Sequence, residues 1–172
     1  MASGSIVTYT FPDGDKYEGQ ADEYGRPHGI GTCTWADSGD RYAGQWYHGE
    51  RSGIGTFVWA DGGVYIGQWY RSKQDGQGTT TWPSGDQYSG GYFEGVRDGL
   101  GTYKWSDGEK ITGEWKDDEI DGLAMYTWPN GSKFVGEYKD SERNGLGVLM
   151  APDGRVEGGV WVNGVQTSRR TP

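Results

Sequence analysis

The sequence has little of what marks secreted, membrane-spanning or disulfide-rich proteins. Its 172 residues include a single cysteine, Cys33, so no internal disulfide can form, which fits a reducing compartment. No stretch approaches the ~20 apolar residues that a membrane-spanning helix needs. The opening Met-Ala-Ser-Gly-Ser-Ile has neither the features of a signal peptide nor a glycine at position two for myristoylation. We therefore expect a cytoplasmic location.

Positive charge is also scarce. Sixteen Lys and Arg stand against 25 Asp and Glu, which gives a net charge of −9, and the one clearly basic cluster is Arg169–Arg170. Nucleic acids and anionic membranes both reward clustered Lys and Arg. The charge predicts no nucleic-acid partner and disfavours binding to acidic phospholipid.

No helical periodicity of useful length is present, and proline is limited to six residues. Glycine, by contrast, reaches 33 residues without a Gly-X-Y triplet, which excludes collagen. Nine Trp, twelve Tyr and four Phe argue against disorder, because disordered segments are poor in aromatic residues. Glycine combined with aromatic residues favours a repetitive β-structure.

A repeat accounts for this composition. An aromatic-x-Gly-x-aromatic unit or a close variant of it starts at residues 17, 42, 65, 88, 111, 134 and 157, with a spacing of 25 residues once and then 23. Each of the first six units continues into Gly-x-Gly (Gly-x-Ala in the fifth) and then an aromatic residue or its substitute, namely Trp35, Trp59, Trp82, Trp105, Trp128 and Ala151. Such a fixed period is the signature of a repeat architecture.

Each unit is predicted to form one β-hairpin. Tyr65, Gly67 and Trp69 are two residues apart and so share a strand face. Segments such as Phe11-Pro-Asp-Gly14 predict a type I turn that ends on a left-handed glycine. The fold class that we predict is all-β, an elongated single-layer meander of antiparallel hairpins, because a lone hairpin is marginal in water and stacked neighbours stabilise it.

Three segments follow from this alignment: an N-terminal segment 1–7, the array 8–164 and a polar tail 165–172 that we expect to be frayed. The strand around 156–162 would then be an open edge, which invites an end-to-end homodimer. Within the array, we expect the rings to lie across neighbouring strand glycines and cover the bare backbone. The opposite face, with Gln45, Gln68 and Glu114, has the composition of a solvated surface.

Residues that carry chemistry are few. We expect charged five-residue hairpin loops at 48–52, 71–75, 94–98, 117–121 and 140–144. The acidic run at 117–121 offers oxygens to a divalent cation, but its spacing matches no calcium loop, which favours a solvated loop. His28 and His48 are not spaced as metal ligands with Cys33, and no nucleophile elbow with plausible partners occurs. We predict no catalytic, cofactor-binding or metal-binding residues, and no enzyme activity.

The motif Tyr-x-Gly-x-Trp, then Gly-x-Gly, an aromatic residue and a Gly-terminated turn, at a period of 23 residues, resembles the MORN repeat over residues 8–164. The resemblance implies a single-layer, groove-shaped array of hairpins without enzymatic activity. Members of that family act as scaffolds of cytoskeletal or membrane-associated structures, or are attached to larger enzymes. Ile111 for Tyr, Ala124 for Gly and Ala151 for Trp depart from the motif.

The leading functional prediction is a protein-interaction scaffold that holds an extended or helical partner segment in an aromatic-lined groove. The alternatives are a module that binds acidic phospholipid and a regulatory repeat domain of a larger enzyme. The candidate groove residues are Tyr42, Trp46, Trp59, Tyr65, Trp69, Trp82, Tyr88, Tyr92, Trp105, Trp115, Trp128, Phe134 and Tyr138.

Replacing a ring of the predicted ladder should destabilise the fold strongly. We expect Trp69→Ala to cost ~3–5 kcal/mol of unfolding free energy, the range for truncating a large buried aromatic side chain. Equilibrium denaturation measures this loss, and a cost below ~1 kcal/mol would remove Trp69 from the ladder.

Overall fold

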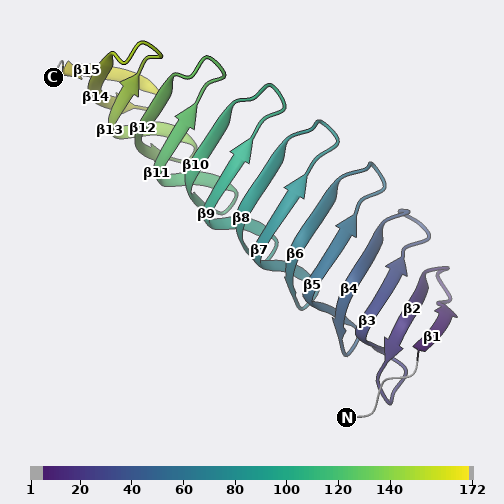
Figure 1. Cartoon of the computed structure of the whole chain (residues 1–172). Coiled ribbons are helices and arrows are strands. Elements are labelled where there is room, and N and C mark those ends of the chain that lie inside the picture. The colour runs from purple at the N-terminus through teal and green to yellow at the C-terminus, as the bar shows by residue number, and fades with distance from the viewer. Residues whose placement is uncertain (1–5, 171–172) are drawn as a thin grey trace. The chain divides into compact units, whose positions relative to one another are not determined.

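The computed structural model describes residues 6–170, and within that range it consists of strands and turns. The strands are β1 (Ile6–Thr10), β2 (Lys16–Ala21), β3 (Pro27–Thr34), β4 (Arg41–Tyr47), β5 (Glu50–Val58), β6 (Val64–Tyr70), β7 (Lys73–Thr81), β8 (Gln87–Phe93), β9 (Val96–Lys104), β10 (Lys110–Lys116), β11 (Glu119–Thr127), β12 (Lys133–Lys139), β13 (Glu142–Met150), β14 (Val156–Val162) and β15 (Val165–Arg170). Their order in the sheet is their order in the chain (Figure 1). The predicted all-β antiparallel meander is confirmed.

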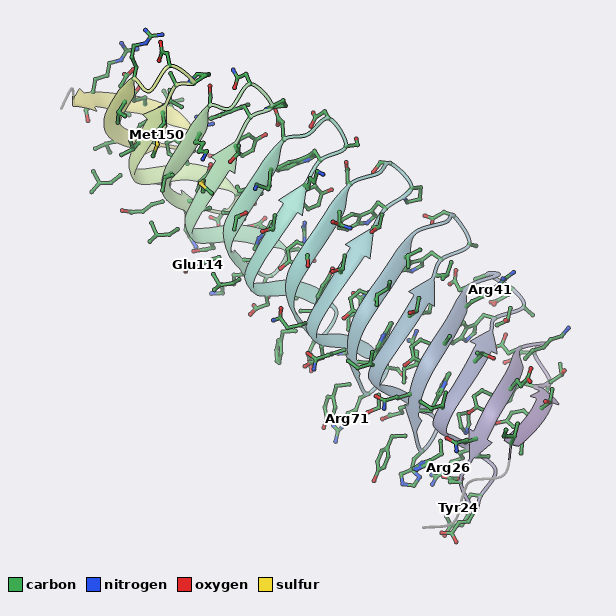
Figure 2. All side chains as sticks on the ribbon, viewed as in Figure 1. Tyr24, Arg26, Arg41, Arg71, Glu114 and Met150 are labelled. Carbon is green, nitrogen blue, oxygen red and sulfur yellow. The ribbon has the colours of Figure 1, made fainter. Side chains whose placement is uncertain are left out.

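The chain divides into two compact units. Of the described residues, unit 1 comprises 6–83 and 92–95, and unit 2 comprises 84–91 and 96–170. Side chains project from both faces of the strands in each unit (Figure 2). No helix within residues 6–170 has the length and apolar character that crossing a membrane requires.

The paired glycines lie opposite each other, and a tyrosine ring covers them. In unit 1, Gly67 pairs with Gly78 across β6 and β7. A Cβ atom on either glycine would lie under 3.0 Å from the Tyr65 side chain, so only glycine fits beneath the ring. The Tyr65 hydroxyl donates a hydrogen bond to the carbonyl oxygen of Gln68 at 2.8 Å, and the ring is fully buried. The prediction that rings cover strand glycines is confirmed.

In most repeats, a β-bulge follows the glycine pair. After Gly44 pairs with Gly55, the register shifts, so that Trp46 pairs with Arg51. The Gln45 side chain folds over the bulge, and its Oε1 accepts the Ile54 N–H at 2.7 Å. Our interpretation of this glutamine position as merely solvated was therefore incomplete, because its amide satisfies a backbone donor that the bulge leaves unpaired.

The hairpin turns are tighter than predicted. In each of the five predicted loops, only the first two residues form the turn and the next three begin a strand, so the expectation of five-residue loops was wrong. Both turn residues have positive φ, for example 49° at Asp117 and 70° at Asp118. This is the conformation of a type I′ turn, whose twist matches that of the flanking strands.

At the opposite ends of the hairpins, the predicted type I turns with a left-handed glycine are present. The Gly14 N–H donates to the carbonyl oxygen of Phe11 at 2.9 Å, and Gly14 has φ +95°. The turns that end at Gly131 and Gly154 have the same hydrogen bond and a positive φ.

The expectation of a frayed tail was wrong for Val165–Arg170, which form β15. Val162 pairs with Val165 through a two-residue turn, so β14 is covered and is not the open edge. Polar residues suffice here because one face of an outer strand can remain in water. Residues 171–172 of the predicted tail and residues 1–5 of the predicted N-terminal segment lie outside the described range.

One repeat of unit 2 replaces the ring and a glycine together. Ile111 stands where four of the repeats have tyrosine, and Ala124 faces Gly113 where those repeats have a second glycine. Both side chains are buried, at 5% exposure each. The shorter isoleucine leaves room for the alanine methyl group, so the two departures compensate each other.

This compensation predicts a strong coupling between the two positions. Ile111→Tyr alone should cost ~1–3 kcal/mol of unfolding free energy, because the new ring meets the Ala124 methyl group. Adding Ala124→Gly should recover at least ~1 kcal/mol. A double-mutant cycle by equilibrium unfolding measures the coupling. Effects that add within ~0.5 kcal/mol would contradict the account.

Candidate functional site: an aromatic groove in the second unit

A row of half-buried rings runs across the hairpins of unit 2. Tyr103 and Trp105 lie 4.7 Å apart between ring centroids, Trp105 and Tyr126 lie 5.6 Å apart, and Tyr126 and Trp128 lie 4.8 Å apart. The two tryptophans directly follow β9 and β11, and the two tyrosines lie near the ends of these strands. The four rings therefore form one continuous apolar strip whose edges remain accessible.

This strip borders a groove of about 710 Å³. Trp115, Ile120 and Tyr138 also line the groove and are at most 7% exposed, so they form its floor. Arg97, Asp118, Ser141 and Arg143 contribute polar groups to the lining. The groove thus combines a rigid apolar floor, a half-exposed aromatic strip and a few charged groups, which is the usual composition of a binding site.

Two arginines of the groove lie against aromatic rings. The guanidinium carbon of Arg97 lies 4.4 Å from the centroid of Trp115, and its Nε donates to Oδ1 of Asp118 at 2.8 Å. The guanidinium carbon of Arg143 lies 4.6 Å from the centroid of Phe134 and 5.3 Å from that of Trp128. Within residues 6–170, Arg143 has no ion-pair partner, so its charge is available to a ligand.

Unit 1 has a related arginine. Arg51 lies 4.5 Å from the Trp69 centroid, and burial lowers its pKa below the usual value. It borders a smaller groove of about 330 Å³ together with Trp59 and Trp69. Arg51, Arg97 and Arg143 are 46 residues apart, so arginine occupies this position in every second repeat. Sequence reasoning missed these arginines, although this doubled period was a readable signal.

The thirteen predicted groove residues fall into three sets. Four are at most 1% exposed and leave no ring surface for a partner: Tyr42, Tyr65, Tyr88 and Phe134. Five are 6–7% exposed and pack beneath the surface: Trp46, Trp69, Tyr92, Trp115 and Tyr138. Four are half-buried: Trp59, Trp82, Trp105 and Trp128. Only the last set presents substantial ring area, and Trp105 and Trp128 lie together in the groove of unit 2.

Burial also keeps the ladder tyrosines neutral. It raises the pKa of Tyr42 to about 12 and raises the pKa of Tyr65 as well, in each case chiefly because the phenolate would lose its hydration. These phenols therefore act as hydrogen-bond donors within the sheet at any physiological pH.

The tryptophans also differ in their hydrogen bonds. The indole N–H groups of Trp46, Trp69 and Trp115 donate to the carbonyl oxygens of Gly31, Gly55 and Gly101 at 3.1, 3.3 and 3.2 Å. Among the residues that the structure describes, the N–H groups of Trp105 and Trp128 make no such bond. The half-buried pair can therefore donate to an acceptor on a partner.

The other residues with possible chemistry are engaged within the chain. Asp118 pairs with Arg97, and Asp121 forms an ion pair with Lys139, so much of the acidic run at 117–121 is already balanced. Cys33 is buried, and burial raises the pKa of its thiol to about 11, which leaves it unreactive at neutral pH.

The fold and its period define a repeat protein built from tandem β-hairpins. The model of the MORN repeat family matches residues 8–16, 23–39, 42–64, 65–87, 88–110, 112–133 and 134–154. The chain therefore belongs to the MORN repeat family. No curated protein matches the chain as a relative.

Solved structures with a similar fold were also found. The TCP domain of SAS-4 (dCPAP) of Drosophila melanogaster, solved in complex with a proline-rich motif of Ana2 (dSTIL), is 15% identical with a TM-score of 0.59. The match covers 93% of this chain and 86% of that one. The TCP10 domain of Danio rerio CPAP, solved with a peptide of STIL, is 16% identical with a TM-score of 0.37, over 91% and 84% of the two chains. At 15% identity the likeness to the dCPAP TCP domain concerns the fold alone.

Proposed function

We propose that this chain is a peptide-binding module that holds an extended, proline-containing segment of a protein partner in the groove of unit 2. The observation that carries the proposal is the strip of half-buried rings at Tyr103, Trp105, Tyr126 and Trp128. The two indole N–H groups of this strip have no acceptor among residues 6–170. Aromatic-lined grooves bind proline-rich segments because the polyproline II conformation is already formed and loses little entropy on binding.

The spacing of the two tryptophans supports this choice of ligand. Trp105 and Trp128 follow strands that are two apart in the sheet, a separation of about 9.6 Å. A polyproline II helix repeats every three residues, or about 9.3 Å. A segment that crosses the strands could thus place two prolines of a Pro-x-x-Pro motif on the two indoles, while its backbone carbonyls accept the indole N–H groups.

The positive charge of Arg143 indicates a further feature of the bound segment. The Arg143 guanidinium lies between Phe134 and Trp128 and has no acidic partner within residues 6–170. Charge-assisted hydrogen bonds to a carboxylate are about twice as strong as neutral ones. We therefore expect an acidic residue beside the prolines in the bound segment. The similar fold of the dCPAP TCP domain, solved with a proline-rich motif, is consistent with this ligand class.

Selection from a random peptide library displayed on phage tests the proposal, with the full chain as bait. We expect enrichment of peptides with two prolines three residues apart and a nearby Asp or Glu. In fluorescence anisotropy, Trp128→Ala should weaken the best peptide at least 10-fold, because an aromatic anchor of an interface contributes 2 kcal/mol or more. Arg143→Gln should weaken acidic peptides more than their Asn or Gln analogues.

Trp59→Ala is the matched control, since Trp59 occupies the same repeat position in unit 1. It should leave the affinity unchanged, and near-UV circular dichroism verifies that both variants remain folded. Selection that yields no proline-containing peptide would contradict the proposal. So would peptides whose affinity is the same for the wild type and for folded Trp128→Ala.

A further inference from the structure

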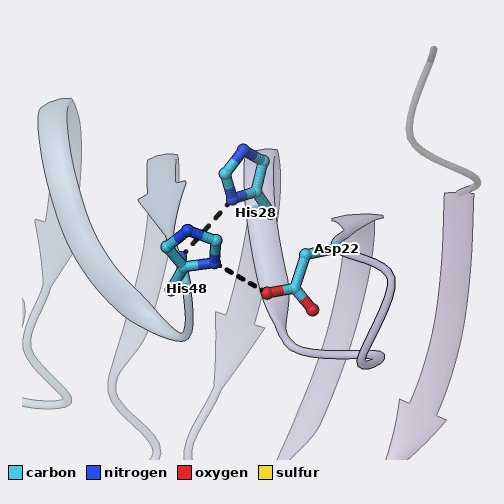
Figure 3. A group of neighbouring side chains, drawn as sticks. All are labelled: Asp22, His28 and His48. Atoms are coloured by element: carbon cyan, nitrogen blue, oxygen red, sulfur yellow. Dashed lines mark hydrogen bonds and ion pairs between the residues drawn. The ribbon is translucent and has the colours of Figure 1, made fainter.

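A carboxylate and two imidazoles meet in unit 1, remote from the groove in sequence. Asp22 follows β2, His28 lies on β3, and His48 is the first residue of the turn between β4 and β5 (Figure 3). One ligand atom of each residue lies within 4.8 Å of those of the other two. Oδ2 of Asp22 is 2.8 Å from Nδ1 of His48, and the backbone N–H of His48 faces Nδ1 of His28 at 3.5 Å.

Hairpin stacking brings the two histidines together from 20 positions apart. The Gly49 N–H donates to the carbonyl oxygen of Pro27 at 2.8 Å, which fixes the turn that carries His48 beside the start of β3. The two imidazole centroids lie 5.0 Å apart as a result. Each later repeat has the same backbone link, but the histidine pair occurs only here.

The carboxylate is held in place by its own loop. The loop between β2 and β3, residues 22–26, is longer than the later two-residue hairpin turns. Among the described residues, it is the one loop whose carboxylate lies beside two histidines. Oδ1 of Asp22 accepts the backbone N–H groups of Tyr24 and Arg26, each at 3.0 Å. The Asp22 side chain is 8% exposed, whereas that of His48 is 42% exposed, so the cluster is fixed on one side and open to solvent on the other.

We propose that Asp22, His28 and His48 form a binding site for a divalent transition-metal ion, with Zn²⁺ as the preferred physiological candidate. Imidazole nitrogens and a carboxylate oxygen are ligands that zinc accepts, and three protein ligands with one open position are a known arrangement. Ligand atoms about 2.1 Å from a tetrahedral ion are about 3.4 Å apart. The most widely separated ligand atoms, up to 4.8 Å apart, therefore need to close by about 1.4 Å, and Asp22 Oδ2 and His48 Nδ1, now 2.8 Å apart, need to open by about 0.6 Å. Rotation of the exposed His48 ring permits both changes.

Arg26 competes with a metal ion for Asp22 and His48. Its Nε donates to Oδ2 of Asp22 at 2.8 Å, and its Nη2 lies 2.9 Å from Nδ1 of His48. The guanidinium thus lies where it neutralises the carboxylate, and its side chain is 47% exposed. Binding of a metal ion requires this arginine to swing into solvent. Removing its charge should therefore strengthen metal binding, an effect that a purely structural ion pair would not produce.

Isothermal titration calorimetry of the full chain with ZnCl₂ tests the site. We expect one equivalent to bind, with a rise in Tm because the ion stabilises only the folded state. His28→Gln and His48→Gln should each reduce the affinity at least 10-fold, while Arg26→Gln should increase it. Ni²⁺ should compete with zinc, whereas Mg²⁺, which prefers oxygen ligands, should not.

Asp153 and Arg155 provide the matched control. They form the same kind of carboxylate–guanidinium pair in a turn, with Arg155 Nε 2.7 Å from Asp153 Oδ2, and the metal-ligand cluster does not include them. Asp153→Asn should leave zinc binding unchanged. The proposal would be overturned if the wild type took up no zinc. It would also be overturned if both histidine variants, verified as folded by circular dichroism, bound zinc as well as the wild type, because the ion would then be adventitious.

Discussion

A tyrosine ring lying across two facing glycines is the contact on which the hairpins with the full motif depend. Facing glycines in two strands are destabilising unless a side chain covers the bare backbone. Tyr65 covers Gly67 and Gly78, and its hydroxyl donates to the carbonyl oxygen of Gln68. These four residues thus provide close packing, burial of an aromatic ring and a satisfied polar group.

Because some rings are buried over glycine pairs, only the others have surface that a partner could contact. The tyrosines at the glycine pairs have no free surface, and tryptophans such as Trp69 are held by hydrogen bonds to the sheet. The aromatic residues that follow the Gly-x-Gly strands are only half-buried, because they lie beyond the glycine pairs. The fold therefore buries one class of rings in the sheet and leaves another class, represented by Trp105 and Trp128, with ring surface exposed.

Much of the fold was predictable because the 23-residue period repeats the local rules many times. The alternation at Tyr65, Gly67 and Trp69 correctly predicted the buried face, and the Gly14 turn had the expected geometry. The two-residue turns were missed because residues such as Arg71 and Ser72 rarely adopt positive φ. No glycine offsets that φ penalty in this turn, whereas Gly49 and Gly95 reduce it in two of the other turns.

The candidate sites were less predictable, because they depend on contacts between hairpins. Arg143 lies against rings from other strands, and His28 and His48 meet only after two hairpins stack. Comparing their linear spacing with that of Cys33 could not reveal this, since the partner of the histidines is Asp22. The signal was a residue type that occurs in a single repeat, as the histidines do, or in every second repeat, as the arginines do. Aligning all repeats at a period of 23 residues hides such differences between them.

The central claim is that the tyrosine ring is what forbids a side chain at the second glycine of each pair, such as Gly55, where the three nearest atoms to an added Cβ all belong to Tyr42. The most direct test is the unfolding free energy that Gly55→Ala costs, measured by equilibrium denaturation in the wild type and in the Tyr42→Ile background. We expect Gly55→Ala to cost ~1–3 kcal/mol in the wild type, where the tyrosine ring covers the glycine. In the Tyr42→Ile background the cost should be at least ~1 kcal/mol smaller, because the natural pair Ile111 and Ala124 shows that isoleucine leaves room for an alanine. An equal loss in both backgrounds would contradict it.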